Sequence, residues 1–193
     1  MSKTGTFIGK SKLTALTIVH CILVAVALVL DCITLIKYAA FMTFAMKATI
    51  VLSIVGMLAA FGYILLGYSK KAAGLYKTYI IMYILACVIS MCGITKYGNA
   101  EIADLMLKLV IFTILIILAF RTDNGKTASY ILAGVLVLAA LGQILYAVFG
   151  FAAYPQEKVS YAIMHRIAEF MLASTAGVMV MAKYTDKAER GTK

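Results

Sequence analysis

Six long apolar runs constrain this chain more than any other feature of its sequence. A helix needs about 20 predominantly apolar residues to cross the hydrocarbon core of a bilayer. Runs that approach this length cover residues of about 14–36, 48–68, 78–95, 103–120, 127–150 and 160–182. They are continuous, whereas the strands of a membrane β-barrel alternate apolar and polar residues over about ten positions. The sequence therefore predicts an all-α integral membrane protein with a six-helix transmembrane bundle.

The composition supports the same class of protein. Hydrophobic residues make up 64% of the chain and charged residues 13%, whereas soluble domains are about half apolar and about a quarter charged. No polar stretch is long enough to fold separately, so residues 1–193 are predicted to form a single domain. The first apolar run is too long for the core of a signal peptide, and we expect it to be a retained span.

Basic residues are distributed unevenly between the two ends of the predicted helices. The two termini and the second and fourth connections carry twelve of the 18 Lys and Arg residues, and the other connections and span ends carry six. The positive-inside rule then predicts that both termini are cytoplasmic, in a multi-pass protein of the cell (inner or plasma) membrane. Basic residues at the cytoplasmic rim also explain the net charge of +10 without nucleic acid, so no nucleic-acid partner is predicted.

The connections add two observations. The link between Lys37 and Lys47 is apolar between its lysines, so we expect it to lie in the interface or to extend a helix. Three predicted helices begin with similar pairs, Lys12-Leu-Thr14, Lys77-Thr78 and Lys126-Thr127. Three tandem helical hairpins would explain this faint repeat, and so would the shared demands of membrane boundaries.

The first predicted helix carries polar and small residues along one face, at Thr17, His20, Val24, Ala27, Asp31 and Thr34. Residues at this spacing lie on one side of a helix. Because ionisable side chains in a membrane almost always avoid lipid, this face is predicted to point into the bundle.

The last predicted helix carries His165, Arg166 and Glu169. The spacing allows Glu169 to reach either basic residue. One interpretation is a self-neutralising group that lowers the cost of membrane insertion. The other is a cluster that binds a ligand or handles protons, and the sequence favours neither strongly.

Other polar positions suggest contacts between helices. Gln143, Tyr146 and Gly150 share one face of the fifth span, and Tyr83, Cys87 and Ser90 share one face of the third. The second span has a stripe of small and polar residues, which predicts close helix packing: Thr49, Ser53, Gly56, Ala60, Tyr63 and Gly67. The four cysteines lie inside apolar runs, where we expect them to behave as small hydrophobic residues.

Most of the polar groups belong to the predicted outer half of the membrane. The candidate ligand-binding residues are Asp31, Ser90, Lys108, Gln143, His165, Arg166 and Glu169. We expect them to line an outward-facing cavity. Lys108 and Arg166 favour an anionic or zwitterionic ligand, whereas Asp31 and Glu169 favour an amine or a proton.

Signatures of enzymes and channels are absent from the sequence. There is no HExxH, no GxSxG and no phosphate-binding loop. There is no TVGYG-like selectivity filter and no run of arginines typical of a voltage sensor. His20 and His165 alone are weak evidence for a metal. The sequence therefore favours a non-enzymatic protein, and no cofactor and no metal are predicted.

These features together favour a small transporter, or the substrate-binding membrane subunit of one, for a small charged solute. The layout of six helices in under 200 residues is similar to that of the substrate-binding subunits of energy-coupling-factor vitamin transporters. No motif matches, and those subunits carry more proline and tryptophan than this chain, which has one proline and no tryptophan. The alternatives are a non-catalytic assembly or regulatory subunit and an intramembrane enzyme that processes lipid. The expected partners are the lipid bilayer and a small-molecule ligand, with a protein partner or a second copy of the chain left open.

Overall fold

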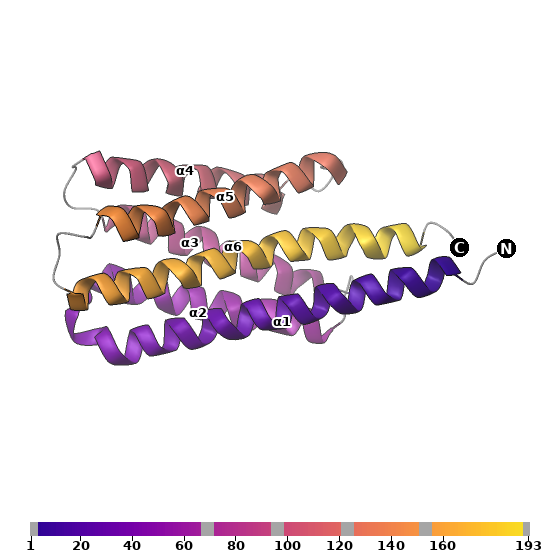
Figure 1. Ribbon diagram of the computed structural model, residues 1–193, viewed down its shortest axis with the longest axis horizontal. Helices are drawn as coiled ribbons and strands as arrows, with labels where there is room; N and C mark the ends of the chain where they lie inside the picture. Colours follow the sequence, from indigo (N-terminus) through magenta and orange to yellow (C-terminus); the bar gives the residue numbers. More distant parts are fainter. Residues whose placement is uncertain (1–3, 67–71, 94–98, 121–125, 151–155, 191–193) are drawn as a thin grey trace.

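The computed structural model describes residues 4–66, 72–93, 99–120, 126–150 and 156–190, apart from the side chains near some helix ends. Every regular element in these ranges is helical. The elements are α1 (Thr4–Tyr38), the 3-10 helix η1 (Ala39–Phe41), α2 (Phe44–Leu65), α3 (Ala73–Cys92), α4 (Asn99–Phe120), α5 (Lys126–Gly150) and α6 (Gln156–Arg190). All six α-helices are long and apolar enough to cross a membrane, and they pack as a bundle (Figure 1). The prediction of an all-α, multi-pass membrane protein is confirmed.

The helices form a closed ring in chain order. Each helix packs against its neighbours in the sequence, and α6 packs along α1 to close the ring. Helix α6 also packs against α2 across the bundle. Because all consecutive helices pack together, the packing does not group them into three hairpins, and the threefold repeat stays a prediction.

The two end helices are longer than a bilayer requires. Each has 35 residues, which at 1.5 Å per residue is roughly 50 Å, against about 30 Å for the hydrocarbon core. Figure 1 shows α1 and α6 side by side, continuing together past the other four helices. The start of α1 and the end of α6 therefore lie at one end of the bundle, and the last turns of α1, α3 and α5 lie at the other.

The predicted link between Lys37 and Lys47 extends both of its neighbouring helices. Lys37 belongs to α1, and Lys47 belongs to the first turn of α2. Between them the chain turns through η1, and the Thr43 hydroxyl caps α2 by accepting a hydrogen bond from the Met46 amide at 3.3 Å. The link is therefore short, and it holds α1 and α2 antiparallel.

The polar face of α1 points into the bundle, as predicted. Five of its six residues are fully buried: His20, Val24, Ala27, Asp31 and Thr34. The outer surface of the same helix exposes Ile18, Ile22 and Val29. This pattern of polar residues inside and apolar residues outside is that of a helix embedded in lipid.

The small-residue stripe on α2 packs against α3. Thr49, Ser53, Gly56, Ala60 and Tyr63 are all buried, and the last member of the predicted stripe lies outside the described residues. A Cβ atom built on Gly56 would lie 3.4 Å from the Cβ of Met82 and 3.6 Å from the Tyr79 carbonyl oxygen. The absence of a side chain at Gly56 thus lets the two helices approach closely, which confirms the predicted role of the stripe.

Candidate functional site

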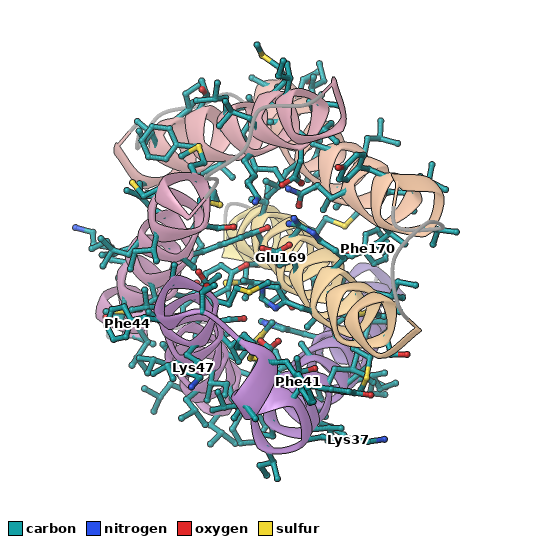
Figure 2. All side chains as sticks on the ribbon, turned by 90° about the vertical axis from the view of Figure 1, so that its left-hand side faces the viewer. Lys37, Phe41, Phe44, Lys47, Glu169 and Phe170 are labelled. Carbon is teal, nitrogen blue, oxygen red and sulfur yellow. The ribbon has the colours of Figure 1, made fainter. Side chains whose placement is uncertain are left out.

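Three ionisable side chains of α6 meet inside the bundle. Glu169 contacts both of the basic residues that precede it on the helix. Its Oε2 accepts a hydrogen bond from Arg166 Nη1 at 2.6 Å, and its Oε1 lies 3.6 Å from His165 Nε2. Figure 2 shows Glu169 on α6 within the ring of helices. The structure thus uses both pairings that the spacing allows.

Helices α4 and α5 extend this group on one side. Asp104 of α4 accepts a hydrogen bond from Arg166 Nη2 at 2.9 Å and forms an ion pair with Lys108, one turn further along α4, at 2.7 Å. Gln143 of α5 donates to the other Asp104 oxygen at 3.3 Å. Asp104 therefore joins three helices through three side-chain contacts.

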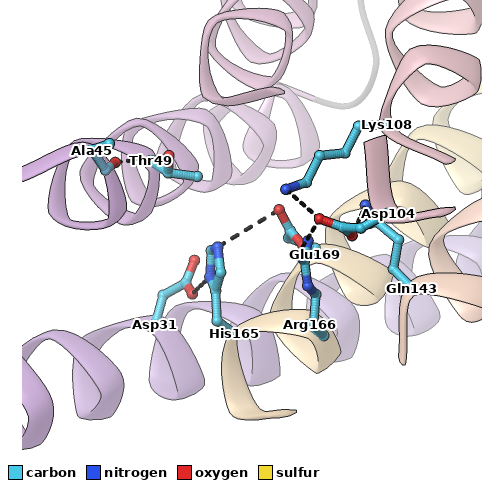
Figure 3. A network of polar contacts seen from close by, with 9 residues as sticks. All are labelled: Asp31, Ala45, Thr49, Asp104, Lys108, Gln143, His165, Arg166 and Glu169. Atoms are coloured by element: carbon cyan, nitrogen blue, oxygen red, sulfur yellow. Dashed lines mark hydrogen bonds and ion pairs between the residues drawn. The ribbon is translucent and has the colours of Figure 1, made fainter. Parts of the chain in front are cut away.

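Helix α1 extends the group on the opposite side. Asp31 Oδ1 lies 3.3 Å from His165 Nδ1. Figure 3 follows the resulting chain of contacts from Asp31 through His165 and Glu169 to Arg166, Asp104 and Lys108. We call these six residues, together with Gln143, the charge network.

The charge network lies within the membrane-spanning segments, and its residues are buried except for His165 and Arg166, which are partly exposed. It contains three acidic side chains (Asp31, Asp104 and Glu169) and, besides His165, two basic ones (Lys108 and Arg166), all counted here with their usual charges. A protonated His165 brings its formal charge to zero, and a neutral His165 leaves one negative charge. Removing such charges from water costs several kcal/mol per ion after relaxation, so each ion must find compensating partners inside the protein.

The charge network occupies the half of the bundle that is opposite the chain ends. Its members on α4 and α6 stand nearer the first residues of those spans, whereas Asp31 and Gln143 stand nearer the last residues of theirs. In an antiparallel bundle these positions share one end. The predicted gathering of polar groups in one half of the membrane is therefore present in the structure.

Six of the seven predicted site residues belong to the charge network. The exception is Ser90 of α3, which is half-buried and makes no hydrogen bond to the network in the part of the chain that the structure describes. Two other residues of α3, Tyr83 and Cys87, lie within electrostatic range of Glu169 and Arg166. The predicted polar face of α3 therefore approaches the charge network through Tyr83 and Cys87.

Sequence reasoning missed Asp104, which is the most highly connected residue of the charge network. The residue stands at the edge of the predicted fourth span, where a carboxylate is expected to reach the interface. A signal was present nonetheless, because Asp104 precedes Lys108 by one helical turn, and such pairs attract each other on a helix.

The residues of the charge network do not gather into a recognisable metal site. Among the described residues, no group of three or more His, Cys, Asp or Glu side chains could hold a metal ion. His20 lies on the same buried face of α1 as Asp31, nearer the start of the helix. All four cysteines are free thiols, and Cys32 and Cys92 are exposed.

Comparisons with known proteins give no match. The chain matches no protein-family model, and no similar protein was found among the curated proteins or the solved structures.

Proposed function

We propose that this protein is a membrane transporter, or the solute-binding membrane subunit of one, and that the charge network is its site for a small charged solute. The observation that supports the proposal is the network itself: six ionisable side chains from three helices, joined inside the membrane-spanning part of the bundle. Ionisable residues inside membranes are rare and mark substrate or ion pathways.

A purely structural role explains the network less well. Buried ion pairs are often no more stabilising than apolar residues of similar volume, so stability alone does not favour them. The packing of small residues already holds the helices together elsewhere, as between α2 and α3. A binding role accounts for the collection of both signs of charge at one depth.

The network could receive a solute by exchange of partners. Arg166 is held by the carboxylates of Glu169 and Asp104, at 2.6 and 2.9 Å. A solute carboxylate that replaces either one preserves the charge around the guanidinium, and a solute ammonium group can take the place of the Lys108 ammonium beside Asp104. A zwitterionic solute with both groups would fit this arrangement best.

The proposed orientation follows the positive-inside rule. The termini and the second and fourth connections of the sequence carry twelve of the 18 basic residues, so by this rule the termini are cytoplasmic. The charge network then lies in the outer half of the membrane.

Thermal unfolding of the purified protein in detergent tests the proposal. The assay adds amino acids, nucleosides and vitamins one at a time, and a true ligand raises the unfolding midpoint in proportion to the logarithm of its concentration above Kd. The shift should disappear in Glu169→Gln and persist in Thr113→Val, which removes an exposed hydroxyl of α4. A midpoint that no member of the library moves, in the wild type as in Glu169→Gln, contradicts a solute site in the charge network.

One observation favours a second function, that of an assembly subunit. Helices α1 and α6 continue together beyond the other four helices and form a two-helix extension (Figure 1). Such an extension offers a surface to a partner protein. Purification from native membranes distinguishes the two functions, since an assembly subunit brings down a stoichiometric partner that is lost when α6 is shortened to end at Ala182.

A further inference from the structure

Three buried oxygen atoms have no hydrogen-bond partner among the described residues. They are Asp31 Oδ2, Ser53 Oγ and Tyr83 Oη, on the consecutive helices α1, α2 and α3. Their residues are 0%, 2% and 2% exposed. Buried polar atoms in native proteins are nearly always satisfied, so each exception calls for an explanation.

The equivalent groups elsewhere in the bundle are satisfied, which makes these three unusual. The other two carboxylates of the charge network, Asp104 and Glu169, use both of their oxygens. Tyr79, one turn from Tyr83 on the same helix, donates its hydroxyl to the Leu172 carbonyl of α6. The hydroxyls of six other helical residues donate to the carbonyl four residues earlier, namely those of Thr34, Thr49, Thr78, Thr113, Ser174 and Thr175. Ser53 lacks even this local bond, which a serine in a helix can readily form.

Ser53 and Tyr83 lie at the same level of the bundle. The register of α2 and α3 is fixed at two points, because Gly56 faces Tyr79 and Met82, and Gly93 faces Ala45. In an antiparallel pair, one turn back from Gly56 on α2 corresponds to one turn forward from Tyr79 on α3. Ser53 is therefore level with Tyr83, and both side chains are buried.

Asp31 shares this level. It stands about 10 Å along α1 from Tyr38, and Ser53 stands about 13 Å along α2 from Phe44, at 1.5 Å per residue. Those two helix ends are joined by the short turn through η1. Asp31 also contacts His165, which contacts Glu169, and Glu169 in turn lies within electrostatic range of Tyr83. The three residues thus lie at one level of the bundle, on the three helices next to one another in chain order, and Asp31 belongs to the charge network.

We propose that Asp31, Ser53 and Tyr83 form a binding site for a small monovalent cation, between α1, α2 and α3. A carboxylate and two hydroxyl oxygens are hard ligands that suit sodium, and they equally accept hydrogen bonds from ammonium. One bound cation balances the negative charge that the network carries when His165 is neutral. The site goes beyond the proposed function, since it rests on these three oxygens and requires no solute in the charge network.

The cation site is tested by thermal unfolding of the purified protein in matched chloride salts. Sodium, potassium and ammonium are compared at constant ionic strength with N-methyl-D-glucamine, which is too large to be enclosed by three side chains. The expected result is a saturable rise of the unfolding midpoint with sodium or with ammonium, because a ligand that binds only the folded state stabilises it. A response to sodium identifies an alkali-metal site, and a response to ammonium alone identifies a site for a protonated amine.

Conservative variants locate the response. Ser53→Ala and Tyr83→Phe each remove one ligand oxygen, outside the contacts of the charge network, and should weaken the apparent affinity about tenfold. Tyr79→Phe is the matched control, since it removes a hydroxyl that already has a partner, and its cation response should equal that of the wild type. Binding of radioactive sodium to the wild-type protein gives a reading that does not depend on unfolding.

Two results would overturn the cation site. One is an identical midpoint in all four salts together with no bound sodium, which leaves the three oxygens to water or to one another. The other is a cation response that Ser53→Ala and Tyr83→Phe leave unchanged, which places the ion elsewhere. Neither result affects the test of the solute site, which measures solutes at fixed salt.

Discussion

The two sides of the charge network differ in how completely their polar atoms are paired. On the α4–α5 side, formed by Asp104, Lys108, Gln143 and Arg166, the ionic contacts are 2.7 and 2.9 Å long. Arg166 also reaches Glu169 at 2.6 Å. On the α1–α3 side, the imidazole of His165 makes contacts of 3.3 Å with Asp31 and 3.6 Å with Glu169. Three oxygens at this level, of Asp31, Ser53 and Tyr83, have no partner among the described residues.

Both sides lie at one depth of the membrane and both contain a carboxylate, so neither depth nor residue type explains the difference. The α4–α5 side has two basic side chains and an amide to satisfy one aspartate, whereas the α1–α3 side offers its aspartate a single imidazole. A site whose polar atoms all have partners is stable as it stands and holds the helices together. An unsaturated site can gain from a ligand, because binding supplies the missing partners.

The largest expected difference in the free energy of unfolding is between variants of two neighbouring residues of α6. Arg166→Gln removes the cation that Asp104 and Glu169 share, and should lower the free energy of unfolding by about 3–5 kcal/mol, as for other broken buried ion pairs. His165→Gln keeps a hydrogen-bonding group beside Asp31 and should cost about 1 kcal/mol. Unfolding of both variants in the same detergent measures the difference. Equal losses would show that the two sides contribute alike and would remove the comparison.

The fold was predictable because lipid leaves few alternatives, but the pairings inside it were not. Continuous apolar runs predict the six spans, and the spacing of His20, Asp31 and Thr34 correctly predicts which face of α1 is buried. The spacing does not tell which helices are neighbours, so it could not pair Asp31 with His165 or Gln143 with Asp104.

Depth was the second quantity that the sequence left uncertain. Ser90 shares a face with Tyr83, yet it lies two turns nearer the end of α3, and it makes no hydrogen bond to the charge network among the described residues. Asp104 stands at the edge of a span in the sequence, but ring closure brings α6 against α5 and α4 against α5, so that its carboxylate reaches Arg166. Both differences come from helix packing, which side-chain periodicity does not encode.

A difference in stability of intermediate size is expected between variants of the two aspartates. Asp104→Asn removes a charge that balances both Arg166 and Lys108, and hydrogen bonds to charged groups contribute about 1.5–3 kcal/mol each, so we expect a loss of about 2–3 kcal/mol. Asp31→Asn changes only the 3.3 Å contact with His165, and in sodium-free buffer it should cost less than about 1 kcal/mol. Thermal unfolding under that condition provides the measurement. A greater loss of stability in Asp31→Asn than in Asp104→Asn would show that the α1–α3 side, and not the α4–α5 side, contributes more to holding the bundle together.

The smallest expected effect differs in sign between two tyrosines of one helix. Tyr79→Phe deletes a hydroxyl that donates to the Leu172 carbonyl, and should lower the free energy of unfolding by about 1 kcal/mol. Tyr83→Phe deletes a buried hydroxyl that has no partner among the described residues, so in sodium-free buffer the variant should be as stable as the wild type or slightly more stable. The rings themselves stay in place in both variants, which leaves apolar packing constant. Added sodium should then stabilise the wild type and Tyr79→Phe but not Tyr83→Phe, because of the two tyrosines only Tyr83 offers its oxygen to the ion. If Tyr83→Phe is as destabilising as Tyr79→Phe without sodium, its hydroxyl is already satisfied inside the protein, and the α1–α3 side is no less saturated than the α4–α5 side.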